Sequence, residues 1–236
     1  MIPPLGSITS CITETVWAKS RQQIDSHKRA QLGHTWVMDS RKFLVPDADL
    51  SGINLSDADL SGLDLSRTIW KKANLSMANL TNAILTDADL TGANLTGANL
   101  TNANLIGANL SDAILSYAIL SFSKLDNADL TNANLTKANL EMADADHIHD
   151  DLSMTGANLT GANLTGATLW LADLTNANLL NANLTDADLT GANLTDATLD
   201  NANLTDADLT GANLTDATLD NANLKGATMP DGTIHD

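Results

Sequence analysis

The stretch ANLTG at residues 93–97 is a typical copy of a five-residue phrase that fills most of this chain. With the leucine position called i, the phrase occurs 36 times between residues 47 and 229. Leucine occupies i in 32 copies, and alanine occupies i−2 in 31 copies. Twenty copies precede an interruption that begins near residue 146, and 16 follow it. A repeat this regular determines the architecture of the chain.

A period of five fits neither a regular helix nor a flat strand. On an α-helix, successive leucines would advance by about 500° and drift around every side. On a strand, an odd period would send every second leucine into solvent. All the leucines are buried only if the chain turns a corner once per repeat. Positions i and i−2 then point inward, and i−1, i+1 and i+2 point outward.

The length of one coil is indicated by an internal duplication. Residues 185–204 read TDADLTGANLTDATLDNANL, and residues 205–224 repeat these 20 residues identically. Twenty residues are four repeats, so we predict a coil with four sides. The 36 repeats then make nine coils, stacked at the strand spacing of about 4.8 Å.

The A(N/D)LXX phrase resembles the pentapeptide-repeat family over about residues 47–229. The resemblance implies an all-β solenoid, a right-handed quadrilateral β-helix. The layout, with a non-repeat head and leucine at nearly every i position, is similar to a cyanobacterial member linked to control of heterocyst differentiation. What this implies is a non-enzymatic regulator that binds a signalling protein or a transcription factor.

The repeats divide the chain into segments. Residues 1–46 form a head in which a short helix, compatible with residues 15–32, and short strands are expected to cap the first coil. Residues 47–145 and 154–229 hold repeats in two registers, and residues 230–236 form a short tail. Between the registers, residues 146–153 form a loop. The second register resumes nine residues after Ala145 instead of five, which predicts an insertion of four residues.

Composition and charge restrict the classes of function. The chain has one cysteine, no signal peptide and no run of apolar residues that could span a membrane, so we expect a cytoplasmic protein. Residues 47–236 hold six basic and 26 acidic residues, a net charge of −20. This charge disfavours direct binding to nucleic acid, which requires neutralised phosphates. We expect a monomer, with a tail-to-tail dimer as the alternative.

Candidate sites for chemistry are few. The five histidines show no catalytic spacing and no Gly-rich phosphate loop occurs, so we expect neither an enzyme nor a cofactor. In the inserted loop, two histidines stand beside three carboxylates, which are metal-ligand types. No further His or Cys lies near enough in sequence to complete a metal site, so we interpret the loop as a contact for a partner protein. Its residues are Asp146, His147, His149, Asp150 and Asp151.

Apolar residues at outward positions are the stronger candidates for an interface. Most outward residues are Thr, Ser, Asn, Asp or Gly, and the exceptions concentrate in the coil at residues 106–125. A contiguous apolar patch marks an interface more often than scattered residues do. If the insertion preserves the order of the faces, Leu180 shares the face of Tyr117. The predicted interaction residues are Ile106, Ile114, Tyr117, Ile119 and Phe122.

An acidic rod has a second interpretation, an inhibitor that mimics DNA and occupies a DNA-binding enzyme such as gyrase. The gyrase-protecting members of the family resemble this chain in acidity. They typically carry Phe at many i positions and a C-terminal dimerisation helix, and neither feature is found in this sequence. We therefore favour the regulatory interpretation, although a shared fold alone does not decide between the two.

Overall fold

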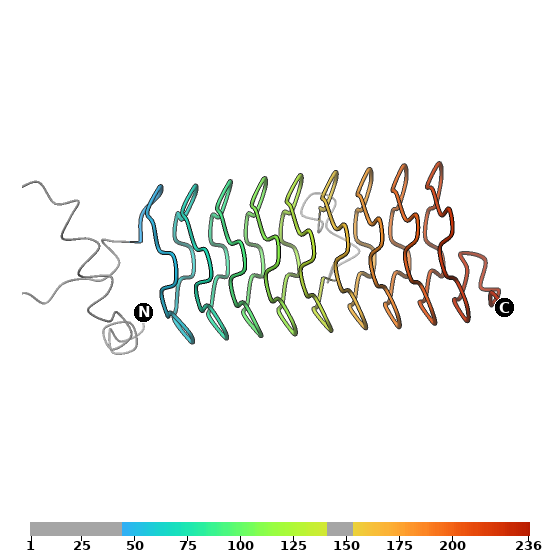
Figure 1. The fold of residues 1–236 in the computed structure, drawn as a ribbon, viewed down its shortest axis with the longest axis horizontal. Coiled ribbons are helices and arrows are strands. Elements are labelled where there is room, and N and C mark those ends of the chain that lie inside the picture. Colours follow the sequence, from blue (N-terminus) through green and yellow to red (C-terminus); the bar gives the residue numbers. More distant parts are fainter. Residues whose placement is uncertain (1–43, 141–152) are drawn as a thin grey trace, which may run out of the picture.

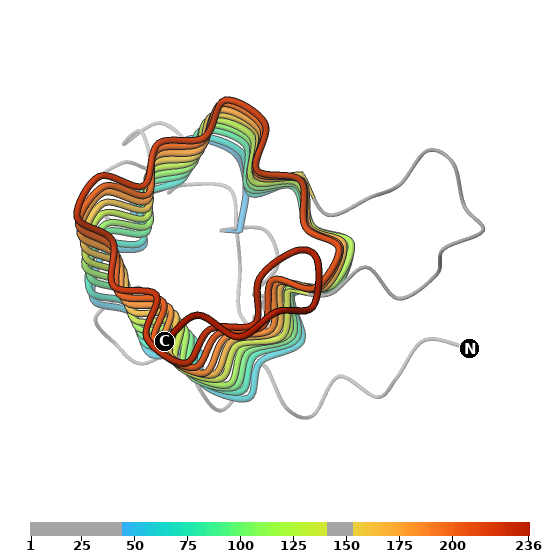
Figure 2. The ribbon, with the colours of Figure 1, turned by 90° about the vertical axis from the view of Figure 1, so that its right-hand side faces the viewer.

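The computed structural model describes residues 44–140 and 153–236 as one rod of stacked coils (Figure 1). In these ranges the backbone contains no helix, and its strands are single bridged residues that alternate with two-residue turns. Viewed along the axis, the coils lie one over another around a common core (Figure 2). The predicted N-terminal helical cap falls in residues 1–43 and lies outside the described residues.

Parallel bridges show that each coil has four sides. Away from the insertion, i−1 residues from Asp49 to Asp208 are bridged to the residue 20 positions later, as Asn94 is to Ile114, and this confirms the predicted four repeats per coil. The two residues after each i residue form a corner, which we name by the faces that it joins. We number the sides faces 1 to 4 after their first leucines, Leu50, Leu55, Leu60 and Leu65.

The insertion is larger than the sequence register indicates. Across it, bridges join residues 29 positions apart instead of 20, as in Lys124 to Ser153, so nine residues are inserted and the predicted four is wrong. Met154 takes the place on face 4 that follows Leu140 on face 3. The described residues of the rod therefore hold 35 repeats and not 36. Ala145, which matches the phrase by spacing, lies outside the described residues.

The larger insertion moves later residues by one face. Bridges from Asp129 to Asn158 and from Asn158 to Asn178 place the repeat that precedes Leu180 on face 1. Leu180 therefore lies at corner 1–2, whereas Tyr117 lies at corner 2–3. The expectation that these two residues share a face is wrong.

Hydrogen bonds explain the residue types at i−1 and i+1. In the repeat around Leu95, the N–H groups of i−1, i and i+2 donate to carbonyls of the neighbouring coils at 2.7–2.9 Å. The N–H of Ala98 donates to the Leu95 carbonyl at 2.9 Å and closes the corner. The fifth N–H, on Thr96, donates to the Oδ1 atom of Asn94 at 3.1 Å. Asn or Asp at i−1 thus satisfies the one backbone donor that no carbonyl reaches.

Backbone conformation explains the residue types at i+2. Every described i+2 residue from Gly52 to Gly226 has a positive φ, between 55° and 72°. Glycine, and to a lesser degree Asn and Asp, adopt this region more readily than other residues do. The exceptions, which hold larger or charged side chains at a positive φ, are Arg67, Lys72, Met77, Tyr117, Phe122, Lys137 and Leu171.

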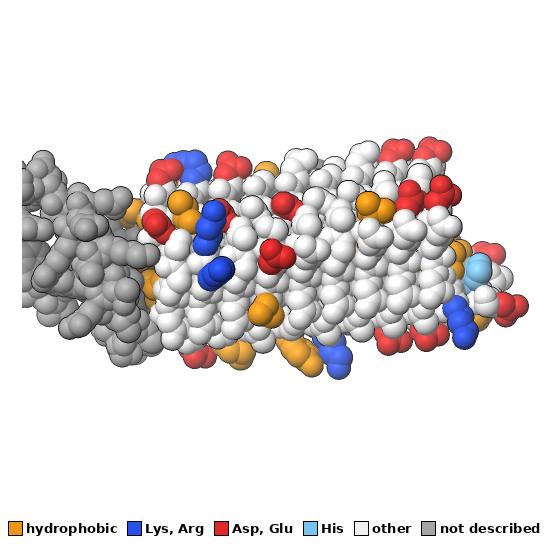
Figure 3. Space-filling view, viewed as in Figure 1, with side chains coloured by type: hydrophobic (Ala, Val, Ile, Leu, Met, Phe, Trp, Pro, Cys, Tyr) orange, Lys and Arg blue, Asp and Glu red, His pale blue; other side chains and the backbone are white. Residues whose placement is uncertain are grey.

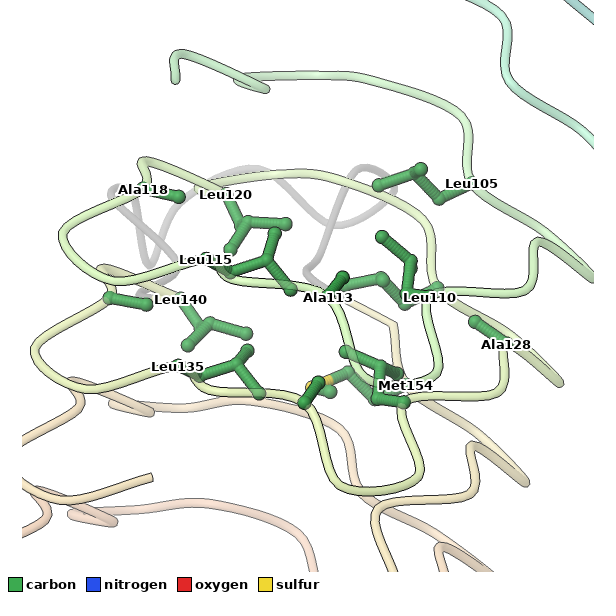
Figure 4. Close-up of a cluster of buried hydrophobic side chains, with 14 of the residues drawn as sticks. Leu105, Leu110, Ala113, Leu115, Ala118, Leu120, Ala128, Leu135, Leu140 and Met154 are labelled. Carbon is green, nitrogen blue, oxygen red and sulfur yellow. The ribbon is translucent and has the colours of Figure 1, made fainter. Parts of the chain in front are cut away.

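Leucine and alanine side chains fill the interior of the rod. Figure 4 shows Leu105, Leu110, Leu115 and Leu120 pointing into one coil from its four sides, and all four are fully buried. Burying each leucine contributes roughly 1.5–3 kcal/mol. Trp70 takes a leucine position on face 1 and is also fully buried, with its indole N–H bonded to the Thr68 hydroxyl at 2.6 Å.

The C-terminal end of the rod is covered on one side. Residues 230–236 fold back as a hairpin, and Ile234 forms an antiparallel bridge with Thr228 on face 3. On the other three sides, Leu214, Leu219 and Leu224 are only partly buried. The last coil therefore contributes less buried surface than the coils in the middle of the rod.

Replacing Leu115 by alanine should lower the free energy of unfolding by about 2–5 kcal/mol, because it leaves a cavity between two packed coils. The same change at Leu224 should cost less, since this side chain is already partly exposed. Urea unfolding of both variants measures the difference. Equal losses would contradict the open C-terminal end described above.

Candidate interaction surface

Three of the five predicted interaction residues meet at one corner of the rod. Ile114 lies on face 2, Ile119 lies on face 3, and Tyr117 lies at corner 2–3 between them. Their side chains are 42%, 41% and 60% exposed, in that order. We call these three residues the Tyr117 corner.

The structure does not bring Ile106 and Phe122 into this group. Ile106 lies at corner 4–1, diagonally across the coil from Tyr117. Phe122 lies at corner 3–4, and both side chains are only partly exposed. Residues that are close in sequence are distributed around the four sides of the coil, so the apolar surface is smaller than the set of predicted residues.

Ile114 and Ile119 each interrupt a row of asparagines, because the bridged residues before and after them are Asn. In such rows the Asn side chain accepts the N–H two residues later, as Asn94 does from Thr96 at 3.1 Å. Isoleucine has no acceptor, so the N–H of Ser116 gains no side-chain bond among the described residues. A missing hydrogen bond of this kind costs about 0.5–1.5 kcal/mol.

Tyr117 departs from the fold's preference in a different way. Its φ is 60°, a region that costs a residue with a Cβ atom roughly 1–2 kcal/mol. Lys137 follows in the same corner of the next coil, with its Nζ atom 5.9 Å from the centroid of the Tyr117 ring. On the other side stand Gly97 and then Met77, whose side chain lies over Gly97: a Cβ built there would be 2.5 Å from the Met77 Sδ. Met77 and Tyr117 thus flank a glycine that leaves room for the thioether.

Sequence reasoning missed Gly97 and Lys137 as neighbours of this corner. Both stand 20 residues from Tyr117, so the coil length already contained the signal. The spacing does not predict that side chains at i+2 lean toward the next coil. That lean carries Met77 over Gly97 and sets Lys137 against the Tyr117 ring.

Aspartates at i−1 accept hydrogen bonds in the same turn through their carboxylates. The Thr210 hydroxyl and N–H donate to Asp208 at 2.6 and 2.9 Å, and these two bonds hold the pKa of Asp208 below its usual value. Corresponding bonds from Ser66 lower the pKa of Asp64. Because the bonds favour the ionised form, these carboxylates are charged at neutral pH.

The second predicted contact, the loop containing Asp146, His147, His149, Asp150 and Asp151, lies outside the described residues. Within residues 44–140 and 153–236, no three His, Cys, Asp or Glu side chains gather into a group that could hold a metal ion. The same ranges contain no helix with the length and hydropathy of a membrane span.

Comparison with protein families identifies the repeat. The family model described as pentapeptide repeats matches five segments that together span residues 48–148 and 153–229. The chain is a pentapeptide-repeat protein. Proteins of this family form a right-handed β-helix, in agreement with the predicted solenoid and with the four-sided coils. Comparison with curated proteins gives no significant match.

Several solved pentapeptide-repeat structures are similar to this chain. HetL, a protein involved in heterocyst differentiation regulation from the cyanobacterium Nostoc sp. strain PCC 7120, is 38% identical over 81% of this chain and 89% of its own, with a TM-score of 0.36. A protein from the Arabidopsis thaliana thylakoid lumen is 33% identical over 48% of this chain and 65% of its own, with a TM-score of 0.35. QnrB1, a plasmid-mediated fluoroquinolone resistance protein, is 18% identical over 74% of this chain and 92% of its own, with a TM-score of 0.39.

Replacing Tyr117 by asparagine should raise the free energy of unfolding by roughly 1 kcal/mol, because asparagine adopts a positive φ more readily. The reverse change at Asn176, which has a φ of 58°, should lower it by a similar amount. Urea unfolding of the two variants tests both signs. A less stable Tyr117→Asn protein would mean that packing of the ring outweighs the backbone preference.

Proposed function

We propose that this protein is a non-enzymatic interaction module that regulates a partner protein by binding it at the Tyr117 corner. The observation that carries the proposal is the concentration of unfavourable residues at one exposed place. Two isoleucines remove a turn hydrogen bond, and a tyrosine takes a backbone conformation that suits glycine. Because the three side chains remain 41–60% exposed, burial offsets these costs only in part. Local costs that the fold does not require are typical of functional sites.

The partner in this proposal is a signalling protein or a transcription factor. HetL is described as involved in heterocyst differentiation regulation, and the phenotype that we would score first is heterocyst formation in a cyanobacterial host. The inserted loop around His147 and His149 is the second proposed contact. We propose that the protein acts as a cytoplasmic monomer and needs no cofactor or metal.

A DNA-mimicking inhibitor of an enzyme such as gyrase is the second candidate. The rows of aspartate favour it, since Asp188 is bridged to Asp208 and both stand on the same face. The leucines at almost every i position are against it, because the gyrase-protecting relatives are expected to carry Phe there. A DNA supercoiling assay with purified gyrase separates the candidates, since the regulatory proposal predicts no inhibition.

The regulatory proposal is tested by changing Ile114, Tyr117 and Ile119 together to asparagine. A protein captured from source-cell lysate by the wild type and identified by mass spectrometry should be lost at least tenfold from this variant. Because asparagine is the consensus residue at i−1 and suits a positive φ, the variant should be no less stable than the wild type.

The matched control is the pair Ile84→Asn and Leu171→Asn. Ile84 is a 41% exposed isoleucine at i−1 of face 4, and Leu171 is an apolar residue at a positive φ. These changes repeat the same chemistry at other corners, so the control should retain the partner. Equal loss from both variants would contradict binding at the Tyr117 corner.

The repeat rod should not bind duplex DNA. Its net charge of −20 over residues 47–236 repels phosphates. Fluorescence anisotropy with a labelled duplex at low salt, about 50 mM, should show no saturable change. Tight binding that weakens with added salt would show that the protein presents a basic surface to DNA and would overturn the prediction.

A further inference from the structure

An acidic row continues the Tyr117 corner toward the C-terminal end of the rod. Along corner 2–3, successive coils present Tyr117, Lys137, Gly166, Asp186 and Asp206. Beside it on face 3, bridged residues run Ile119, Asn139, Thr168, Asp188 and Asp208. Three coils later, therefore, two aspartates occupy the positions of the tyrosine and the isoleucine. Along the lower edge of the rod in Figure 3, an acidic side chain comes first and is followed by hydrophobic, basic, acidic and again basic side chains.

The distance between the two parts suits one interface. Three or four coils at the strand spacing correspond to about 14–19 Å along the axis. Stable interfaces have an apolar centre and a polar or charged rim, and they bury about 800 Å² on each partner. An apolar centre at Tyr117 and a rim at Asp186 and Asp206 fit within a surface of that size.

The rim carries uncompensated negative charge. Asp186 and Asp206 are exposed, and among the described residues neither they nor Asp188 and Asp208 form an ion pair. Hydrogen bonds from Thr210 keep Asp208 ionised. Lys137 stands in the same row between Tyr117 and the aspartates, with its Nζ atom 5.9 Å from the centroid of the Tyr117 ring. Lys225 lies at the same corner beyond Asp206, so the four aspartates leave the C-terminal part of this row with a net negative charge.

We propose that the Tyr117 corner and the four aspartates form one interface for a positively charged, amphipathic segment of a partner protein. This inference rests on the proposed function and adds the chemistry of the partner. Apolar side chains of the partner contact Ile114, Tyr117 and Ile119, and its Lys or Arg residues pair with the aspartates. A second copy of this chain would instead set like charges against each other. The apolar centre governs dissociation, and the acidic rim governs the rate of association and its salt dependence.

The chain offers a selective probe, because Tyr117 is its one tyrosine. Full-length protein labelled with 3-fluorotyrosine gives a single ¹⁹F resonance at the proposed centre. We would titrate it with a synthetic amphipathic peptide of leucine and lysine, and with the same peptide carrying glutamate in place of lysine. The lysine peptide should shift the resonance in a saturable manner, and the glutamate peptide should not.

Variants separate the two parts of the interface, and stopped-flow measurement with the lysine peptide gives both rate constants. Ile114→Asn with Ile119→Asn should raise Kd at least tenfold, mainly through faster dissociation. Neutralising the rim with Asp186→Asn, Asp188→Asn, Asp206→Asn and Asp208→Asn should slow association severalfold and flatten its dependence on salt.

The matched control for the rim removes four aspartates from other corners of the same coils, with Asp196→Asn, Asp200→Asn, Asp216→Asn and Asp220→Asn. Its total charge equals that of the rim variant, so a specific rim predicts a much smaller effect. Equal effects from the two variants, or equal binding of the glutamate peptide, would overturn the inference. A ¹⁹F shift that depends only on protein concentration would also overturn it, because the occupant would then be a second copy.

These outcomes remain distinct from those of the proposed function. A lysate partner that requires Ile114, Tyr117 and Ile119 but ignores salt and the four rim substitutions would retain the proposed function and reject a basic partner. A lysate in which no partner depends on these three residues would reject the proposed function, whatever the synthetic peptide does.

Discussion

Each corner of the rod is closed by a hydrogen bond from the N–H of i+3 to the carbonyl of i, as from Ala98 to Leu95, and this closure requires a positive φ at i+2. The other features of the fold follow from that turn. It directs the chain along the next face after five residues, so that i and i−2 always point inward. It also leaves the N–H of i+1 without a carbonyl partner, which Asn or Asp at i−1 supplies through its side chain. The residue preferences within the five-residue phrase therefore follow from the requirements of a single turn.

Such uniformity makes departures informative. On the surface of a globular protein, an exposed isoleucine or tyrosine has many explanations, and scattered examples need none. Here the turn requires a side-chain acceptor at i−1 and a positive φ at i+2. A residue that does not suit its position therefore lowers the stability of the rod by a measurable amount. At the Tyr117 corner three such residues are adjacent. In the preceding coil, Asn94 and Asn99 accept the turn hydrogen bond that Ile114 and Ile119 cannot accept. The inference of function thus rests on the lower local stability of the rod at the Tyr117 corner.

The sequence predicted the four-sided coil and the inward and outward positions, because both follow from a period of five and a duplication of 20 residues. It also predicted that Ile114, Tyr117 and Ile119 lie together. The insertion was misjudged because Ala145 matches the phrase by spacing, whereas the bridge from Lys124 to Ser153 puts Met154 in the next place after Leu140. The partial exposure of Ile106 and Phe122 depends on how side chains lean between coils, which a repeat pattern does not specify.

The central claim is that the Tyr117 corner is less stable than the fold allows. Its most direct test is the free energy of unfolding of the variant in which Ile114, Tyr117 and Ile119 are all asparagine, measured in urea against the wild type. Two turn hydrogen bonds at about 0.5–1.5 kcal/mol each and a relieved backbone worth roughly 1–2 kcal/mol predict a rise of about 2 kcal/mol or more. A value equal to or below that of the wild type would contradict the claim, because the three residues would then be part of what holds the rod together.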